Sequence, residues 1–290
     1  MNRHPLLFLT LWGLLSLRLQ AGEINWLIAD FAPCHMPDDE QQKGYCDELD
    51  GYMMSRLPEY QHHISLSSFP RYEALMKTDA NFCTSDLLFS EQRNEYMDYS
   101  RPMLPILPNG VLIRTGDERF DTYIDPQGKV DLYQLLQQHL ILGINQARSY
   151  SPEIDKLLFK FQGIALTSIM DSRYKAIDLL VAKRFDYTFG YPTEVGLFEF
   201  QSAENIDKVR YIPIAGVPPL FETYFSCKKS PASQRHIGDI NRILQHSDVL
   251  SVFVPFYQKW LPEAVVADYQ QRVNDYLTGK QVATEKHSQQ

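Results

Sequence analysis

A polar turn after the apolar run at residues 140–144 is a place where this sequence could hold a charged small molecule. The run is unbroken, which is typical of a strand buried on both faces. The polar residues 145–155 come next, and we expect a helix to begin among them. The first turn of a helix has unpaired N–H groups at its positive end, so this turn could seat an anion. Ser149 could instead be the cap of that helix, and capping and ligand contact are compatible.

Arg93 is a second side chain that could bind an anion. It lies among acids and amides at residues 90–94, after an apolar run that ends at Phe89. Three prolines within residues 102–108 make the following chain extended, because each ring fixes its own φ and restricts the preceding residue. A new apolar strand is predicted at residues 111–114. We interpret the passage as a crossing between two lobes, and the alternative for Arg93 is a surface side chain in a helix cap.

The elements that must position these residues alternate between strands and helices. Strands are predicted at residues 24–29, 64–66, 111–114, 140–144, 209–214 and 224–228, and a further strand begins at residue 81. Helices are predicted at 49–57, 72–77, 132–139, 171–183 and 237–244, and residues 249–262 close the last lobe. Strand–helix alternation before the crossing favours a parallel sheet.

Residues 1–21 have the pattern of an export signal. Arg3 and His4 give a basic start, residues 6–17 are almost wholly apolar, and Ala21 ends a stretch suited to cleavage. The apolar core of about twelve residues is too short to span a bilayer. The alternative is a buried first helix. No cysteine lies directly after the cleavage point, so we expect a soluble exported chain without a lipid anchor there.

The charge balance of the chain is acidic. Without Arg3 and Arg18 of the leader, 26 basic and 36 acidic residues remain, a net charge of −10. This disfavours nucleic acid and anionic membrane surfaces as partners. With 44% hydrophobic residues, the chain can build one large or two medium domains without metal.

The four cysteines predict disulfides in an exported protein, with three possible pairings. We favour Cys34–Cys46, which closes a short loop, and Cys83–Cys227, which joins the strand before the crossing to a late strand. Loop entropy makes each bond worth about 3 to 5 kcal/mol, and the longer loop gains more.

A metal site is the alternative use of the first cysteine pair. Cys34, His35 and Cys46 could bind a metal together with His62 or His63. The sequence has no paired spacing such as CxxC or HExxH, so we expect no metal and no cofactor.

The order of residues at the crossing resembles a known family. The passage contains, in order, an apolar strand, Ser90, two residues, Arg93, an aromatic-Ser-x-Pro sequence at 99–102 and a new strand. This order is similar to the first crossing between lobes in periplasmic solute-binding proteins of family 3, the amino-acid-binding type. The likeness extends over about residues 23–275. It implies an α/β type II periplasmic-binding fold, in which each of two lobes is a mostly parallel sheet flanked by helices. The implied units are a signal peptide at 1–21, lobe I at 22–108 plus 212–275, lobe II at 109–211 and a disordered tail at 276–290.

The resemblance assigns ligand contacts to residues at the ends of strands. Arg93 matches an arginine that grips a ligand carboxylate. Phe31 matches a ring that packs on the ligand, although it could be ordinary core. The turn 148–150 matches an Arg-Ser-Tyr variant of an uncharacterised branch of the superfamily. The candidate ligand-binding residues are Phe31, Arg93, Arg148, Ser149, Tyr150 and Tyr191.

Several positions depart from the family pattern. Tyr191 stands where an acid often binds the amino group of the ligand, and Glu194 is the nearest acid. Cys34 replaces a second ring of the family, and Asp86 and Leu88 replace hydroxyl residues. The sequence therefore keeps Arg93 as the partner for a ligand carboxylate and lacks the acid that usually binds the ligand's ammonium group. The resemblance also implies that Asp186 makes structural bonds near the start of its strand.

The implied function is capture of a small anionic or amino-acid-like solute in a cleft between lobes, by a monomer in the periplasm that delivers it to an ABC-type permease. Two alternatives use the same fold. One is a sensory module that docks on a membrane signalling receptor. The other is an enzyme similar to exported dehydratases, with Asp86, Glu194 or Asp30 as acid or base. No nucleophile–base pair or metal motif supports catalysis, so we expect a protein that is not an enzyme.

Overall fold

The computed structural model describes residues 22–36, 42–78, 80–145, 148–170, 176–246 and 248–279. The predicted signal peptide and residues 280–290 of the predicted tail lie outside the described residues. Among the residues described, no helix is long and apolar enough to cross a membrane.

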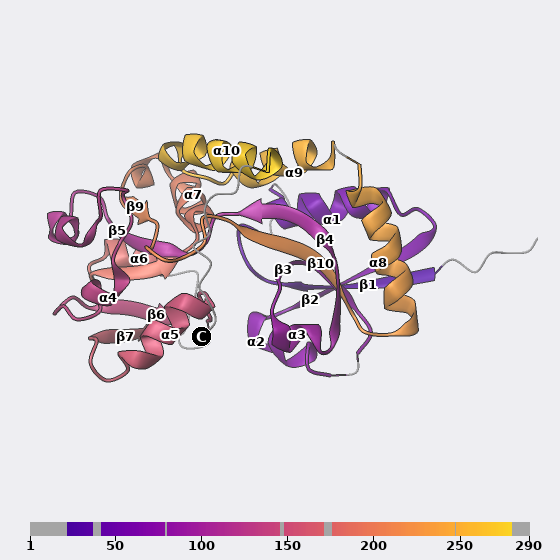
Figure 1. Ribbon diagram of the computed structural model, residues 1–290, viewed down its shortest axis with the longest axis horizontal. Coiled ribbons are helices and arrows are strands. Elements are labelled where there is room, and N and C mark those ends of the chain that lie inside the picture. Colours follow the sequence, from indigo (N-terminus) through magenta and orange to yellow (C-terminus); the bar gives the residue numbers. More distant parts are fainter. Residues whose placement is uncertain are drawn as a thin grey trace, which may run out of the picture.

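The chain forms two separate five-stranded sheets with the same strand arrangement (Figure 1). In the first sheet the order is β2-β1-β3-β10-β4, and in the second it is β7-β6-β8-β5-β9. Each sheet has three parallel strands followed by one strand, β10 or β5, that runs antiparallel to both of its neighbours. The strands are β1 (Gly22–Ala29), β2 (Tyr60–Ser67), β3 (Cys83–Leu88), β4 (Met97–Ile106), β5 (Gly110–Arg114), β6 (Leu142–Asn145), β7 (Thr167–Met170), β8 (Tyr187–Gly190), β9 (Val209–Ile212) and β10 (Phe221–Lys228). The prediction of two α/β lobes is therefore confirmed, with mixed sheets.

Helices flank both sheets. They are α1 (Tyr45–Ser55), α2 (Phe69–Leu75), α3 (Glu91–Asn94), α4 (Leu132–Leu135), α5 (Pro152–Lys160), α6 (Ala176–Val181), α7 (Pro192–Gln201), α8 (Pro231–Leu244), α9 (Val249–Gln258) and α10 (Glu263–Leu277). In Figure 1, α8 lies on the outer side of the first lobe, and α10 lies along the top of the molecule towards the second lobe.

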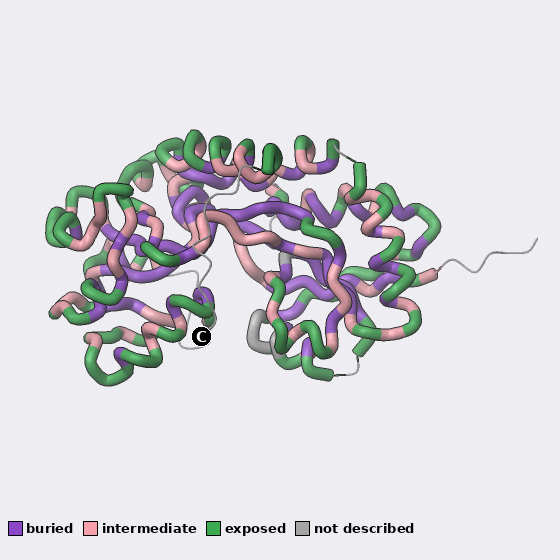
Figure 2. Tube along the Cα trace, viewed as in Figure 1, coloured by how far each residue is buried: buried purple, intermediate pink, exposed green. Residues whose placement is uncertain are grey.

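Each sheet has its own apolar core. In the first lobe, the buried rings of Trp26 on β1 and Phe225 on β10 pack edge to face, with centroids 6.0 Å apart. In the second lobe, Phe120 and Tyr187 pack in the same way at 5.8 Å. Burial of one such ring contributes about 1.5–3 kcal/mol. Figure 2 shows buried residues along the sheets and exposed residues along the outer helices.

The chain crosses between the lobes twice, and the last two helices hold both crossings. The first crossing joins β4 to β5, and there the hydroxyl of Tyr257 accepts a hydrogen bond from the N–H of Leu107 at 3.1 Å. The second joins β9 to β10, and Arg272 of α10 donates to the carbonyl of Pro219 at 3.0 Å. Each crossing is therefore bonded to one of the last two helices.

Both favoured disulfides are confirmed. Cys83 and Cys227 occupy paired positions on β3 and β10, and Cys34, in the turn after β1, is bonded to Cys46 at the start of α1. The alternative metal site loses two of its ligands, because a disulfide sulfur is not the thiolate that binds metal.

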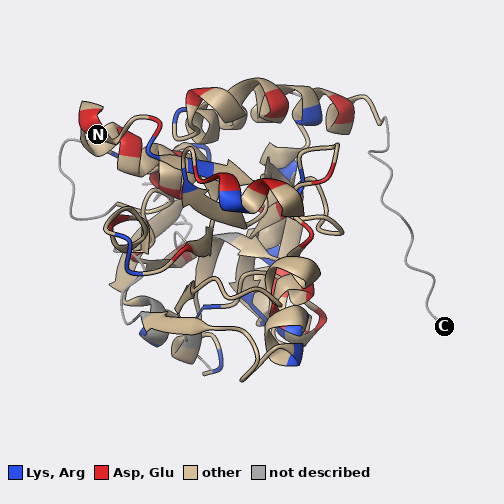
Figure 3. Cartoon of the chain, turned by 90° about the vertical axis from the view of Figure 1, so that its left-hand side faces the viewer, with Lys and Arg blue, Asp and Glu red and all other residues tan. Residues whose placement is uncertain are grey.

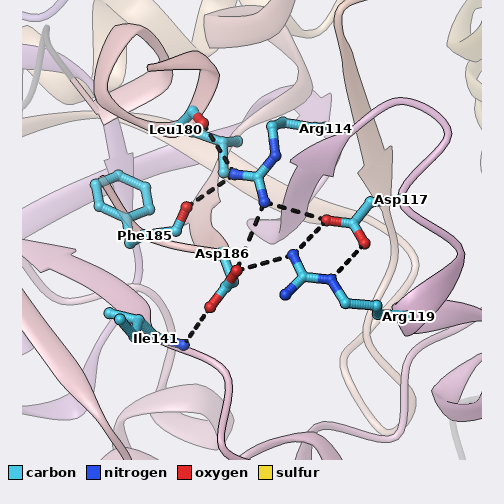
Figure 4. Close-up of polar contacts among 7 residues, drawn as sticks. All are labelled: Arg114, Asp117, Arg119, Ile141, Leu180, Phe185 and Asp186. Atoms are coloured by element: carbon cyan, nitrogen blue, oxygen red, sulfur yellow. Dashed lines mark hydrogen bonds and ion pairs between the residues drawn. The ribbon is translucent and has the colours of Figure 1, made fainter. Parts of the chain in front are cut away.

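A cluster of charged side chains holds the second lobe together at the start of β8 (Figure 4). Asp186 accepts hydrogen bonds from Arg119 and from the N–H of Ile141, both at 2.8 Å. Arg114 donates to Asp117 at 3.1 Å and lies 3.6 Å from Asp186. Asp186 thus makes structural bonds, as the sequence analysis expected.

Several helices begin or end at residues other than those predicted from the sequence. The helix expected at 237–244 begins at Pro231, because Ser230 caps it through the N–H of Ser233. The helix expected at 132–139 ends at Leu135. Part of the helix expected at 171–183 lies outside the described residues, and α6 is described from Ala176.

Candidate functional site

A groove of about 650 Å³ lies between the two lobes. The end of β3 and the start of α5 form opposite walls, and the second crossing with the end of α10 completes it. The residues that line it are Leu88, Phe89, Ser151, Pro152, Glu153, Pro218, Pro219, Leu220, Phe221, Glu222, Tyr224, Tyr276 and Gly279. The volume is that of a site for a small organic molecule.

The lining is mainly apolar and aromatic, with two acids. Phe89, Phe221, Tyr224 and Tyr276 contribute four rings. None of the described lining residues is a Lys, Arg or His. The groove is therefore suited to a solute with an apolar part.

Glu222 on β10 is held in place by two phenols. Its carboxylate accepts hydrogen bonds from the hydroxyl of Tyr224 at 2.7 Å and of Tyr276 at 2.6 Å. Burial, together with these bonds to Glu222, raises the pKa of both tyrosines. Both phenols consequently remain protonated donors near neutral pH, and they connect β10 to the end of α10.

Two of the predicted ligand-binding residues meet across the lobes. Phe31 lies in the turn after β1, and Tyr191 lies between β8 and α7. Their rings are 6.3 Å apart at an angle of 77°, an edge-to-face contact. Both side chains are half-buried, so this contact joins the lobes while it leaves ring surface exposed.

Arg148, predicted to bind ligand, is committed to an ion pair. Its two terminal nitrogens bond the two carboxylate oxygens of Glu194 at 2.8 and 2.9 Å, and one also donates to Asn109 at 2.8 Å. The guanidinium carbon lies over the rings of Tyr150 and Tyr191 at 5.1 and 5.5 Å.

The electrostatic environment keeps Arg148 charged. Burial by itself would lower the pKa of Arg148, but the charge of Glu194 and its hydrogen bonds outweigh burial and raise that pKa. The side chains are only 6% and 14% exposed. The positive charge is thus largely balanced by Glu194, and the pair ties the turn after β6 to the start of α7.

The rest of the predicted turn is also organised by bonds within the protein. Ser151, not Ser149, is the N-cap of α5, because its hydroxyl accepts from the N–H of Ile154. The hydroxyl of exposed Ser149 bonds to Asp155 at 2.5 Å. The buried Tyr150 accepts at its hydroxyl from the N–H of Asn145 at 3.0 Å. The capping role considered for Ser149 is therefore wrong.

Arg93 lies at the edge of the groove. It belongs to the single turn α3, which Ser90 caps by accepting from the N–H of Arg93 at 3.2 Å. One guanidinium nitrogen donates to the carbonyl of Leu88, a groove residue, at 3.3 Å. The side chain is half-buried.

The structure separates the predicted residues into different places. None of the six lines the 650 Å³ groove. Arg148 borders a second cavity of about 70 Å³ that also touches Ala32 of the first lobe and Glu194. Ligand contact by these six residues stays a prediction, and the residues that line the groove are different ones.

Sequence reasoning missed Glu222, Tyr276 and Asn109. Tyr276 was assigned to the tail, although Tyr269, Val273 and Tyr276 have the spacing of one helical face. An acid beside the aromatic residues Phe221 and Tyr224 was the available signal for Glu222. Nothing in the sequence indicated that the buried Asn109 would bond both Arg148 and the carbonyl of Tyr150.

The acids considered for catalysis have different positions. Both carboxylate oxygens of Glu194 are bonded to Arg148, and one also accepts from the N–H of Tyr191 at 2.7 Å, which makes it a poor general base. Asp30 follows β1 and is half-buried. The side chain of Asp86 is not described.

No family model and no curated protein match this chain. Solved structures do match it. A probable amino-acid ABC transporter extracellular-binding protein from Bacillus subtilis shares 16% identity over 84% of this chain and 100% of its own, with a TM-score of 0.63. A putative L-cystine ABC transporter protein from Listeria monocytogenes shares 16% identity over 84% and 97%, with a TM-score of 0.60. The periplasmic VFT2 domain of Bordetella pertussis BvgS shares 15% identity over 81% and 92%, with a TM-score of 0.56. At these identities the likeness shows a shared fold.

Proposed function

We propose that this chain, which has the type II periplasmic binding fold, captures a small organic solute between its lobes and presents it to a membrane partner. The observation that carries the proposal is the 650 Å³ groove, because both lobes and the second crossing contribute to its lining. A solute that contacts both lobes holds them together, since it binds the closed arrangement more tightly than the open one.

The solute that we propose is amino-acid-like, with a carboxylate and an apolar part. The rings and prolines of the groove would cover the apolar part. Arg93, at the edge of the groove beside Leu88, is the side chain proposed to bind the carboxylate. Arg148 would act by holding the turn after β6 in place, because its charge is already paired with Glu194.

The membrane partner that we propose is an ABC-type permease. The Bacillus and Listeria structures carry names of ABC transport proteins, which supports this choice. The likeness to the BvgS domain supports the alternative of a sensory module that docks on a signalling receptor. Figure 3 shows basic and acidic residues intermixed in one view of the molecule, which is consistent with a partner that is not a polyanion.

Native mass spectrometry of the protein purified from the compartment to which it is exported tests the proposal. We expect a small molecule that remains bound under gentle conditions and leaves on unfolding. The Arg93→Gln variant, purified in the same way, should lose that molecule. An empty wild-type protein that also gains no thermal stability from a panel of amino acids and carboxylic acids would contradict solute capture. Neighbouring genes, a permease with its ATPase or a lone signalling protein, would separate transport from sensing.

A further inference from the structure

The two acids of the groove have no obvious purpose in binding a carboxylate. Glu222 and Glu153 are the charged residues among the described lining, and they give this surface a negative charge. A purely anionic solute would be repelled by both. The groove therefore complements a positive group on its occupant, in addition to an apolar one.

Glu222 differs from Glu153 in how firmly it is placed. Glu153 is exposed in the first turn of α5, where its charge already complements the positive end of the helix. Glu222 is half-buried, and its two oxygens are oriented by Tyr224 and Tyr276. Each carboxylate oxygen has two lone pairs, so each can accept a further hydrogen bond from a ligand.

The aromatic rings around Glu222 favour the same kind of group. Tyr224, Tyr276, Phe221 and Phe89 line the groove with it, and aromatic faces attract ammonium groups. Phe89 and Tyr224 both pack on the ring of Tyr99, with centroids 5.2 and 5.6 Å away, which fixes the aromatic wall. A carboxylate beside several aromatic rings is the chemistry that binds an organic amine.

From this arrangement we propose that Glu222, with Tyr224 and Tyr276, is the subsite for the amine of the solute. The proposal rests on the proposed function and names the class of solute as an organic amine with an apolar body. It also places the ammonium partner on β10, in a part of the chain distant from the β8 position where Tyr191 replaces the expected acid. The amine would donate hydrogen bonds to Glu222 while its apolar part lies on the rings of the groove.

Three small probes with the same phenyl group test this assignment on the full mature chain by calorimetry. Phenethylamine is cationic, 2-phenylethanol is neutral and phenylacetate is anionic. We expect wild-type protein to bind phenethylamine more tightly than 2-phenylethanol. The Glu222→Gln variant should lose roughly tenfold to a hundredfold in phenethylamine affinity and keep its affinity for 2-phenylethanol. Glu153→Gln is the matched control, and its affinity for phenethylamine should change less than about threefold, since screened surface charges contribute little.

The outcomes separate this proposal from the proposed function. If Glu222→Gln lost affinity equally for phenethylamine and 2-phenylethanol, or lost affinity for neither, the amine subsite would be overturned. Circular dichroism of the variant shows whether it is folded. Tighter binding of phenylacetate than of phenethylamine by wild-type protein would overturn the subsite and leave solute capture intact. No binding of any probe, together with an empty purified protein, would contradict both.

Discussion

Replacement of Asp50 by Asn should change how the stability of this protein depends on pH. Asp50 lies in α1 and is 4% exposed. Its carboxylate is 3.9 Å from Nδ1 of His35, which is bonded more closely to Asp47 at 2.9 Å. Burial raises the pKa of Asp50 from 3.8 to about 6, although the nearby charge of His35 opposes the rise. The group therefore titrates within the range in which the protein is handled.

The sign and size of the effect follow from proton linkage. A carboxyl group whose pKa is higher in the folded state stabilises that state fully below its unfolded pKa, here 3.8. The contribution is lost as the pH rises through about 6. A difference of about two pKa units corresponds to about 3 kcal/mol in the free energy of unfolding. Asparagine cannot ionise, so Asp50→Asn should lack this loss and should be more stable than wild type above pH ~7.

Urea unfolding of both proteins, followed by circular dichroism across this pH range, measures the effect. We expect the stability difference between variant and wild type to grow by about 3 kcal/mol from low to neutral pH. Asp121→Asn is the control, because the Asp121 side chain is 61% exposed. Stability curves of wild type and Asp50→Asn that stay parallel over the whole range would refute the reasoning.

Three further substitutions test contacts elsewhere in the protein. Glu194→Gln leaves the buried Arg148 without its carboxylate partner, so the free energy of unfolding measured in urea should fall by about 3 to 5 kcal/mol. A loss below about 1 kcal/mol would mean that water screens the ion pair. Gly196→Ala places a Cβ 1.9 Å from the carbonyl oxygen of Trp260, so its thermal midpoint should fall. Gly238→Ala, in a helix with open space around the new methyl group, should raise the midpoint, since Ala favours helix by about 1 kcal/mol, and equal shifts in both variants would contradict the close contact.

Local patterns in the sequence predicted most of the strands, and the resemblance to a known family implied the two-lobed fold. Most strands could be recognised because their apolar runs are short and bounded by polar or turn-forming residues. Both cysteine pairings were correct, because Cys34–Cys46 closes a short loop and Cys83–Cys227 joins two strands that the predicted fold brings together. The helix α10 was missed because its buried positions, Tyr269 and Val273, lie among many polar residues and follow a segment that already appeared to end the lobe.

The groove could not be predicted in the same way because its lining depends on long-range register. Glu222 reaches the groove because β10 lies between β3 and β4, with Thr223 opposite Leu88. The sequence separates these residues widely, and no local pattern encodes that alignment. The buried ion pair of Arg148 with Glu194 was equally unpredictable, because the position of Glu194 in the folded lobe was unknown.

The division of the groove between the lobes determines what a solute must do to close it. Glu222 and Tyr224 belong to β10, which pairs with strands of the first lobe, and Tyr276 belongs to α10, which holds the crossings. An amine bound to these three residues alone would bind the open and closed arrangements equally and would shift nothing. The second lobe contributes Ser151, Pro152 and Glu153 at the start of α5. The apolar part of the solute must therefore reach this wall, so an amine too short to touch it should bind without stabilising the closed form.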